Sequence, residues 1–335
     1  MDDAKYELRE FRDADYPGVV AVRNAGSPDR PVSVEYLRHV DESFREVSQA
    51  YDLVAVERRT GAIVGTASLF RIAFMDDPFF QWISCDIAPD RTRQGIGAAL
   101  YDALRTAAVR RGQRGLRVTV RAGATEALGF AARRGFVERR RVWRSSLDLA
   151  GADTSALPGL LQRLSGAGIV FTTLDAEGAD DPEVVRRVHD LQRDSGKDVP
   201  VLGTHTGIPF EEFCRFFLEG PGALPRSWFL AKDGERYVGM TFASRESTLV
   251  GVLHQDYTGT RREYRGRGIA HALKLLLIRF AQQEGYARID TSNDSLNQPM
   301  WTLNQRLGFR RSNERIQLQC DFSPAAVPPG NRQLH

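Results

Sequence analysis

The chain has 335 residues, of which 42% are hydrophobic and 27% are charged, and its formal net charge is +3. This composition is typical of a globular protein and excludes collagen-like and wholly disordered chains. The sequence contains no apolar run near the ~20 residues that span a bilayer and no signal peptide, so we expect a cytoplasmic protein with no membrane partner.

In the first half, strand and helix patterns alternate in the order of an α/β unit. Alternating apolar residues mark the strands, Thr60-Gly61 marks a hairpin turn, and Leu100, Leu104 and Ala108 share one face of a helix. In chain order we predict a strand at 6–11, helices, a hairpin at 51–70, a strand at 79–89, a glycine loop, a helix, a strand at 116–120, a short helix and a strand at 142–149.

The second half repeats this order at a constant offset of 173 residues from the glycine loop onward. The matching landmarks are Gly95 with Gly268, Gly112 with Gly285, and Gly135-Phe136 with Gly308-Phe309. The predicted elements are a strand at 168–174, helices, a hairpin at 227–243, a strand at 248–260, a glycine loop, a helix, a strand at 287–290, a short helix and a strand at 315–322. We therefore predict an α/β fold of two tandem domains, each with a mixed central sheet flanked by helices.

The repeat also suggests where the domains begin and end. We predict an N-terminal domain at 1–149, a small, polar linker at 150–166, a C-terminal domain at 167–322 and a tail at 323–335. A duplicated chain can mimic within itself the dimer of single units, so we expect a monomer. Extra residues at 194–213 in the second half fit either a lid over the substrate or a surface loop that has drifted.

Each half has a glycine loop between a strand and a helix. Such a loop aims unpaired backbone N–H groups and the positive end of the helix dipole at one point, where they can bind a pyrophosphate. Neither loop has the Lys-Ser/Thr pair of a P-loop. Both follow a fourth strand and have Leu100 or Leu273 where a Rossmann loop has its third glycine.

The second loop, Arg265-Gly-Arg-Gly268-Ile-Ala270, resembles the R/Q-x-x-G-x-G/A signature of the GNAT superfamily of acyl-CoA N-acyltransferases. The resemblance covers both halves and nearly the whole chain. It implies acetyl-CoA as cofactor, with loop amides on the pyrophosphate and the pantetheine arm between two strands that separate. The cofactor-binding residues implied in the second half are Thr258, Gly259, Thr260, Arg265, Gly266, Arg267, Gly268, Ile269, Ala270, His271, Asn293 and Asn297.

The first half keeps the glycine loop but not the side chains around it. Thr92 stands at the position of Arg265, and Ala124 stands at that of Asn297. Because backbone amides do not depend on side chains, this loop could still bind CoA. The missing side chains lead us to expect the catalytic step in the second half. The residues implied for the first half are Ile87, Arg93, Gln94, Gly95, Ile96, Gly97 and Ala98.

Acyl transfer to an amine needs a base, an oxyanion donor and an acid for the leaving thiolate. His254 and Asp256 point to one face of a strand by period-two alternation and are the candidate bases. Many GNAT members have a tyrosine as the acid where this chain has Asn304, which can hydrogen-bond sulfur or pantetheine. Tyr257 or Tyr264 would then replace the acid, or the thiolate would leave unaided.

The residues outside the loops suggest no further cofactor. Cys85, Cys214 and Cys320 are far apart, and the six histidines lack the spacing of metal ligands, so we expect neither disulfides nor a metal. Arginine supplies nearly all the positive charge, and twelve arginines lie between Arg105 and Arg144 against two glutamates. Because the bias extends over the whole chain, we do not expect a nucleic-acid partner.

We therefore expect an N-acetyltransferase that moves the acetyl group of acetyl-CoA directly to a primary amine of a small molecule. Two alternatives stay open. The missing tyrosine fits a catalytically silent acyl-CoA-binding or scaffold protein. The arginine-rich stretch fits an acetyltransferase with an RNA or ribosomal-protein acceptor.

Overall fold

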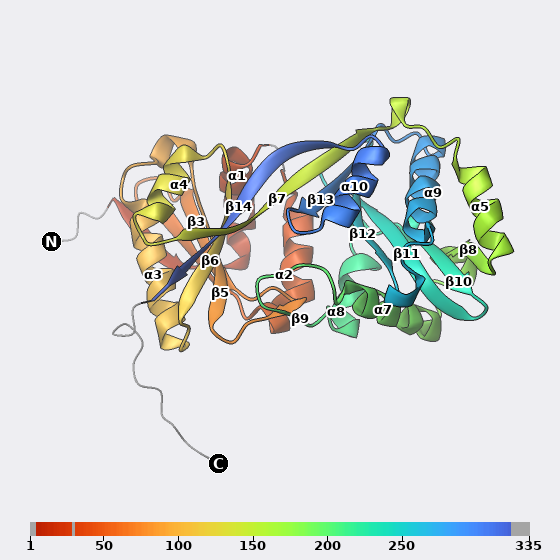
Figure 1. Ribbon diagram of the computed structural model, residues 1–335. Coiled ribbons are helices and arrows are strands. Elements are labelled where there is room, and N and C mark those ends of the chain that lie inside the picture. Colours follow the sequence, from red (N-terminus) through yellow and green to blue (C-terminus); the bar gives the residue numbers. More distant parts are fainter. Residues whose placement is uncertain (1–4, 29–30, 323–335) are drawn as a thin grey trace, which may run out of the picture. The chain divides into compact units, whose positions relative to one another are not determined.

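The computed structural model describes residues 5–28 and 31–322 (Figure 1). The predicted tail at 323–335 lies outside these residues. The chain divides into two compact units: unit 1 contains residues 1–141 and 315–335, and unit 2 contains residues 142–314. Among the described residues, no helix is both long and apolar enough to cross a membrane.

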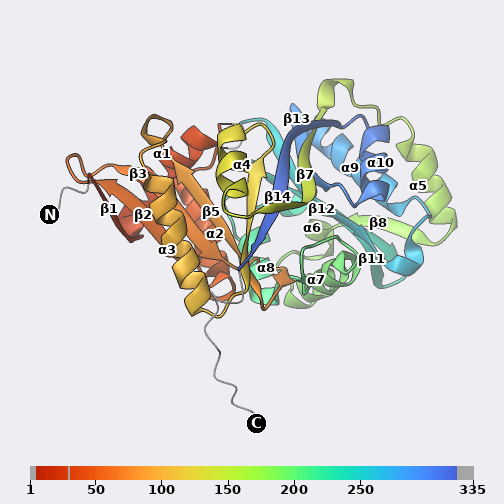
Figure 2. The same cartoon turned by 60° about the vertical axis from the view of Figure 1, so that its left-hand side comes forward.

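Unit 1 is a mixed sheet with helices on both faces (Figure 2). All of its strand pairs are antiparallel except β5 with β6. The strands lie in the order β1 (Tyr6–Glu10), β2 (Tyr51–Glu57), β3 (Ile63–Phe70), β5 (Phe80–Ile87), β6 (Gly115–Arg121) and the end of β14 (Arg310–Asp321). The other elements are α1 (Tyr16–Gly26), α2 (Val34–Ser48), the short strand β4 (Met75–Asp76), α3 (Ile96–Arg110) and α4 (Thr125–Ala132).

Period-two alternation in β2 divides the core of unit 1 between the two faces of its sheet. Leu53 and Ala55 face α3, where they pack with its buried stripe, including Leu100. Val54 faces the other way and packs with Tyr16 of α1, as does Leu37 of α2. The helix periodicity read from the sequence therefore identifies the face of α3 that the sheet buries.

Unit 2 repeats this plan. Helices α5 and α9 share one core with the sheet, whereas α7 and α8 lie on the opposite face around Trp228 and Phe242 (Figure 1). The strands lie in the order β7 (Val137–Asp148), β13 (Arg288–Asp294), β12 (Val252–Thr260), β11 (Arg236–Arg245), β10 (Phe229–Asp233) and β8 (Ile169–Thr173). The other elements are α5 (Leu157–Gly166), α6 (Leu174–Glu177), α7 (Pro182–Gly196), β9 (Thr204–His205), α8 (Phe210–Phe217), α9 (Ile269–Gln283) and α10 (Gln298–Arg306).

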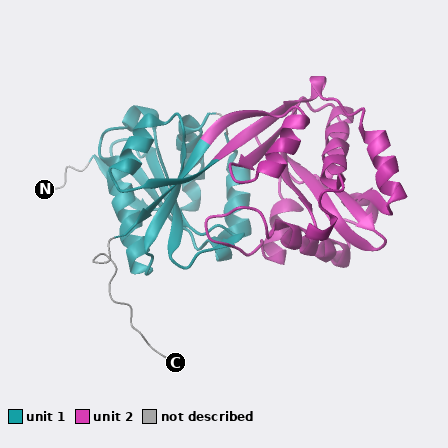
Figure 3. Ribbon diagram, in the orientation of Figure 1, with its two compact units in different colours: residues 1–141, 315–335 teal, residues 142–314 magenta. Residues whose placement is uncertain are grey.

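The last strand of each unit comes from the other half of the sequence (Figure 3). Residues 142–148 of β7 pair with β13 in unit 2, and residues 315–321 of β14 pair with β6 in unit 1. Both strands have 12 residues and end the same repeat, so either one suits either sheet. The compact units therefore differ from contiguous halves by an exchanged strand, and the domain boundaries drawn at 149 and 167 stay a prediction about the repeat.

Two segments that the sequence left irregular have regular structure. The predicted linker at 150–166 contains α5, whose residues Leu157, Leu160 and Leu164 join the core of unit 2. The extra residues at 194–213 form the end of α7, the short strand β9 and the start of α8. The helical leucines of α5 recur at positions 157, 160, 161 and 164, a spacing that turn residues such as Pro158 and Gly159 obscured.

Candidate active site

Strands β12 and β13 of unit 2 separate halfway along their length. They pair in parallel from Val252 with Arg288 to Gln255 with Thr291, and their pairing ends there. Both strands continue, β12 to Thr260 and β13 to Asp294, while their outer edges stay paired with β11 and β7. Peptide groups on the inner edges are thus available to an extended ligand that hydrogen-bonds like an additional strand.

The glycine loop after β12 presents unpaired N–H groups at the start of α9. Gly266 and Gly268 have φ angles of 74° and 93°, which favour glycine. Gly268 is the N-cap of α9, and no side chain caps the first turn. A Cβ atom on Gly266 would meet nothing within 4 Å, so the loop is open toward solvent. These features make the helix start suitable for a phosphate group.

A bulge in β12 interrupts the alternation on which the candidate bases were chosen. Tyr257 lies opposite Phe242 but Gln255 lies opposite Ala243, which leaves Asp256 as the extra residue. The side chain of Gln255 accordingly contacts α9, whereas the Tyr257 hydroxyl lies 2.9 Å from Ser195 Oγ of α7. The bulge therefore interrupts the period-two alternation that predicted His254 and Asp256 on one face of the strand. Their catalytic role stays a prediction.

His254 lies next to a charged cluster in unit 2. Its Nδ1 atom is 3.6 Å from a carboxylate oxygen of Glu246, and both side chains are mostly buried. Glu246 pairs with Arg144 of β7, which also lies 3.1 Å from Asp290 of β13. A carboxylate beside an imidazole can orient the ring, as the acidic residue of a catalytic triad does.

Asn304 of α10 is buried without a partner for its amide. The residue is 1% exposed, and neither Oδ1 nor Nδ2 has a hydrogen bond among the described residues. Thr260 Oγ1, at the end of β12, is likewise buried without a partner there. Unsatisfied buried polar atoms are rare because each one costs about 1–3 kcal/mol. Both residues fall within the predicted acyl-CoA site, and a bound ligand would satisfy them.

Two other predicted asparagines have structural partners. Asn297 caps α10 by accepting a hydrogen bond from the Met300 backbone N–H at 3.4 Å. Asn293 accepts a hydrogen bond from Ser145 Oγ at 2.7 Å. Thr258 belongs to a side-chain network with Thr241 and Gln255, in which its hydroxyl lies 2.8 Å from that of Thr241. These contacts account for the three residues within the protein alone, and their cofactor contacts stay predictions.

Arg265 of the signature binds the segment that follows α7 in this structure. Its Nε donates to the Thr260 carbonyl at 3.1 Å, and its Nη1 lies 2.6 Å from Asp198. Arg262 also pairs with Asp198, and hydrogen bonds from the two arginines lower the pKa of that carboxyl. Arg267 donates to the Glu263 carbonyl at 2.9 Å. The cofactor contacts implied for Arg265 and Arg267 stay predictions.

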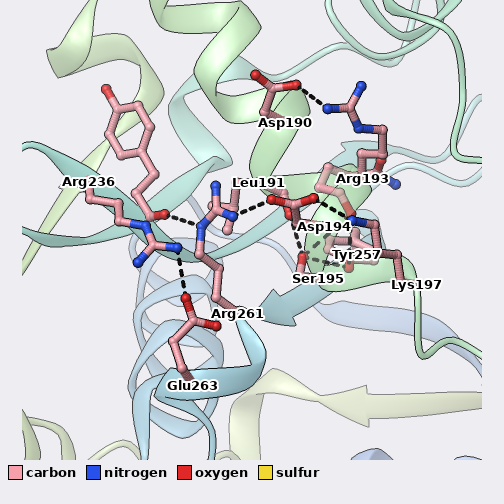
Figure 4. A network of polar contacts seen from close by, with 12 residues as sticks. Asp190, Leu191, Arg193, Asp194, Ser195, Lys197, Arg236, Tyr257, Arg261 and Glu263 are labelled. Atoms are coloured by element: carbon pink, nitrogen blue, oxygen red, sulfur yellow. Dashed lines mark hydrogen bonds and ion pairs between the residues drawn. The ribbon is translucent and has the colours of Figure 1, made fainter.

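The contacts between α7 and the end of β12 continue beyond Asp198 (Figure 4). Asp194 pairs with Lys197 and with Arg261, and the Tyr257 hydroxyl meets Ser195. Gly259 leaves room for this packing, because a Cβ atom there would come within 2.5 Å of the Tyr257 hydroxyl and 2.6 Å of Ser195 Oγ. The segment at 194–213, which fitted either a lid or a drifted surface loop, is therefore anchored to the end of β12 by its α7 residues.

Sequence reasoning missed two cations near the loop. Arg163 of α5 is exposed, and its Nη2 would lie 2.8 Å from a Cβ atom on Gly268. Burial lowers the pKa of His271, and the positive charges of Arg306 and Arg163 lower it further. Lys274 is buried in α9 and bonds to Gln255. The sequence did contain a signal for Lys274, because this lysine falls on the apolar stripe of an amphipathic helix. It contained no signal for Arg163, which lies in the segment predicted as a linker.

The loop of unit 1 has the same backbone with fewer polar side chains. Gly95 caps α3 with a φ of 84°, and Arg93 adopts a φ of 62° where unit 2 has Gly266. The β5 and β6 pairing ends at Ile83 with Val118, so these strands also separate. Gln94 is held by Lys5, whose Nζ donates to its side-chain oxygen at 3.1 Å. Unit 1 thus retains the backbone cradle implied for residues 93–98.

Comparisons with known proteins agree with this geometry. The family model described as "Acetyltransferase (GNAT) family" matches residues 7–136 and 188–309. The chain is 26% identical, over 237 residues that cover 70% of each protein, to mycothiol acetyltransferase of Catenulispora acidiphila.

Two solved structures share the fold along their whole length. A tandem GNAT protein from the clavulanic acid biosynthesis pathway has a TM-score of 0.72 and 20% identity, with 97% of this chain and 99% of that chain covered. A GCN5-related N-acetyltransferase from Sphaerobacter thermophilus has a TM-score of 0.67 and 17% identity, with 97% of each chain covered. The predicted fold of two tandem α/β domains is confirmed.

Proposed function

Since the chain belongs to the GNAT family of acetyltransferases, we propose that unit 2 transfers the acetyl group of acetyl-CoA directly to a primary amine of a small molecule. The buried amide of Asn304 in unit 2 supports this proposal most strongly. It has no hydrogen-bond partner among the described residues, and a bound ligand would supply one.

The residues of unit 2 fit acetyl-CoA in three places. The N–H groups at the start of α9 would hold the pyrophosphate, with Arg163 close by. The open inner edge of β12 from Asp256 to Thr260 would pair with the pantetheine arm, and Thr260 Oγ1 would gain a partner. Asn304 would bind near the thioester end. When bound, acetyl-CoA supplies a carbonyl carbon that an amine nitrogen can attack.

The side chains near the bulge of β12 would then manage protons and charge. His254, which lies beside Glu246, would take a proton from the attacking amine. An N–H group of β12 at the bulge would donate to the carbonyl oxygen as negative charge develops there. Asp256 is the alternative base, since it occupies the bulge itself.

A matched pair of glycine substitutions tests the proposal. Gly268→Glu places a negative side chain in the cradle of unit 2, and Gly95→Glu does the same in unit 1 at a similar positive φ. We expect Gly268→Glu to lower thiol release from acetyl-CoA with an amine panel by about 100-fold or more, because its carboxylate repels the pyrophosphate at close range. Gly95→Glu should keep most of the activity.

Turnover by Gly268→Glu equal to that of the wild type would refute the assignment to unit 2. Tight CoA binding by the wild type, measured by calorimetry, without turnover of any amine would instead favour the silent acyl-CoA-binding protein.

No structural observation favours the RNA or ribosomal-protein acceptor. Three of the twelve arginines that suggested it have partners within unit 1: Arg139 lies 3.5 Å from Asp321, Arg140 Nε donates to Gln317 at 2.6 Å, and Arg141 pairs with Glu138 at 2.7 Å. We therefore keep the small-molecule amine as the proposed acceptor.

A further inference from the structure

Lys274 is a buried amine with no carboxylate partner among the described residues. The residue lies in α9 and is 2% exposed, and its Nζ has one hydrogen bond among the described residues, to Gln255 Oε1. The Phe309 ring lies below it, with 5.1 Å between Nζ and the ring centroid. A protonated amine has three N–H groups, so this site leaves most of its hydrogen-bonding capacity unused.

The position of Lys274 connects it to the predicted thioester end of the site. Gln255 is the last residue of β12 that pairs with β13, and its Nε2 donates to Thr258 Oγ1 at 3.0 Å. On the other side of Lys274, the Phe309 backbone N–H donates to the Asn304 carbonyl at 3.0 Å. Lys274 therefore lies between the point where the strands separate and the helix turn that carries the unpartnered amide.

Unit 1 shows that the fold does not require a lysine at this position. By the repeat offset Tyr101 replaces Lys274, and its ring packs against Phe130 and Phe136. The strand residues that correspond to Gln255, Thr241 and Thr258 are Ile83, Ala67 and Cys85, as the β3 and β5 register shows. The polar network beneath β12 is therefore a feature of unit 2 rather than a structural need of the fold.

The two tyrosines considered as acids from the sequence are engaged elsewhere. The Tyr257 hydroxyl lies against Ser195 of α7, and burial raises the pKa of Tyr257 to about 12. The Tyr264 hydroxyl donates to Asp233 at 2.8 Å, which raises its pKa. Asn304 has no proton that it can give up near neutral pH. Among these candidates none is placed to protonate a leaving thiolate.

Resting on the proposed function, we propose that Lys274 Nζ protonates the sulfur of the leaving thiol. The amine nitrogen forms a bond to the acetyl carbon, and the carbon–sulfur bond breaks with its electron pair on sulfur. Sulfur takes a proton from Lys274 Nζ, and the new amide nitrogen loses a proton to the base. Lys274 regains its proton from solvent, so the products are the amide and the free thiol.

Burial lowers the pKa of Lys274 to about 7. An acid with this pKa gives its proton readily to a thiolate, whose own pKa is about 8.5 in free thiols. A general acid is most effective when its pKa lies near the working pH.

The experiment follows the thiol of bound CoA in the whole protein. The ultraviolet absorbance of the thiolate reports its pKa, and calorimetry measures the affinity for CoA and for desulfo-CoA, which lacks the sulfur. We expect a bound-thiol pKa below that of free CoA, but still above that of Lys274, in the wild type and in the unit 1 control Tyr101→Phe. Lys274→Met should lose this decrease, bind desulfo-CoA as the wild type does, and lower kcat/KM by about 100-fold.

Lys274→Arg separates the charge from the proton. An arginine stays protonated, so the bound thiolate should keep a lowered pKa while kcat falls, because arginine does not release its proton near neutral pH. Equal thiol pKa values in the wild type and Lys274→Met, with desulfo-CoA still bound, would overturn the inference. Failure of the wild type to bind CoA at all would instead overturn the proposed function.

Discussion

The two glycine loops share a backbone but differ in the interior beneath them. Gly95 and Gly268 cap equivalent helices with φ angles of 84° and 93°, and the strands before them separate from their neighbours after four paired residues in each unit. Below the strand, unit 2 has Lys274 and Gln255, where unit 1 has Tyr101 and Ile83. A phosphate cradle made of backbone N–H groups does not depend on side chains. Proton transfer does, because it needs an ionisable side chain such as that of Lys274.

The bulge in β12 is a second difference between the units, on the face of the sheet that packs against α7. The β12 and β11 register shifts by one residue at Asp256, but the β5 and β3 register runs without a shift from Gly65 with Ile87 to Phe70 with Trp82. A bulge redirects side chains and exposes a backbone N–H. In unit 2 it turns Tyr257 toward α7, and unit 1 has no equivalent feature. The comparison is testable wherever one unit has a group that the other lacks.

The largest expected effect is on the pH dependence of the free energy of unfolding. Burial disfavours the charged form of one ionisable group in each unit, Lys274 in unit 2 and Asp86 in unit 1, and the two groups carry opposite charges. The pKa of Lys274 is lowered to about 7 by burial, so between about pH 7 and pH 10 the unfolded chain binds more protons and stability rises with pH. The rise is at most about 1.4 kcal/mol per pH unit. Lys274→Met should remove this rise when urea unfolding is measured across the range.

Asp86 of unit 1 is the counterpart. Burial raises its pKa, so stability is lost as pH rises through its folded pKa, starting above the unfolded value of about 3.9. Asp86→Asn should remove that loss without altering the alkaline range. If Lys274→Met and the wild type have parallel profiles above pH 7, Lys274 is not held in an environment that disfavours its charge.

A second expectation concerns Asn304, where unit 1 has Ala131. Asn304→Leu removes an unpartnered buried amide, so the free energy of unfolding of the ligand-free protein should increase by about 1–3 kcal/mol. CoA affinity, measured by calorimetry, should fall by about 10-fold, the value of one lost hydrogen bond in a buried site. Ala131→Ser serves as the matched control in unit 1. A loss of stability with unchanged affinity would show that Asn304 has a structural role.

The sequence predicted features that depend on local backbone rules. Glycines at 95, 266 and 268 adopt the positive φ angles that their loops require, and the constant offset revealed the repeat. It did not predict the exchange of β7 and β14, because the two strands are equivalent in the repeat and pairing is a long-range choice. The bulge at Asp256 escaped for a similar reason, since period-two alternation assumes a regular strand.

The site was only partly predictable for reasons of burial. Lys274 falls on the apolar stripe of its helix, but a lysine normally faces solvent, so this spacing alone did not predict that its side chain is buried. Asn297 matched the family position, yet in the structure its oxygen caps α10, a role that any Asn before a helix can have. Packing across elements decides both cases, and a single sequence does not contain it.

The smallest expected effect concerns the signature arginine, which unit 1 replaces with Thr92. Arg265 is paired with Asp198, and both side chains are more than a third exposed. Because a phosphate and Asp198 would compete for the same guanidinium, Asp198→Asn should strengthen CoA binding. Exposed ion pairs contribute about 0.2–1 kcal/mol, so we expect an increase of at most about 5-fold that diminishes with added salt.

The control for this effect is Asp190→Asn, which also removes one negative charge, from α7 itself, but breaks a pair with Arg193 instead (Figure 4). Calorimetry at low and high salt should show the gain for Asp198→Asn and little change for Asp190→Asn. A weaker affinity for Asp198→Asn would mean that the carboxylate orders Arg265 for the phosphate rather than competing with it. In that case the contact between Arg265 and Asp198 belongs to the binding site itself.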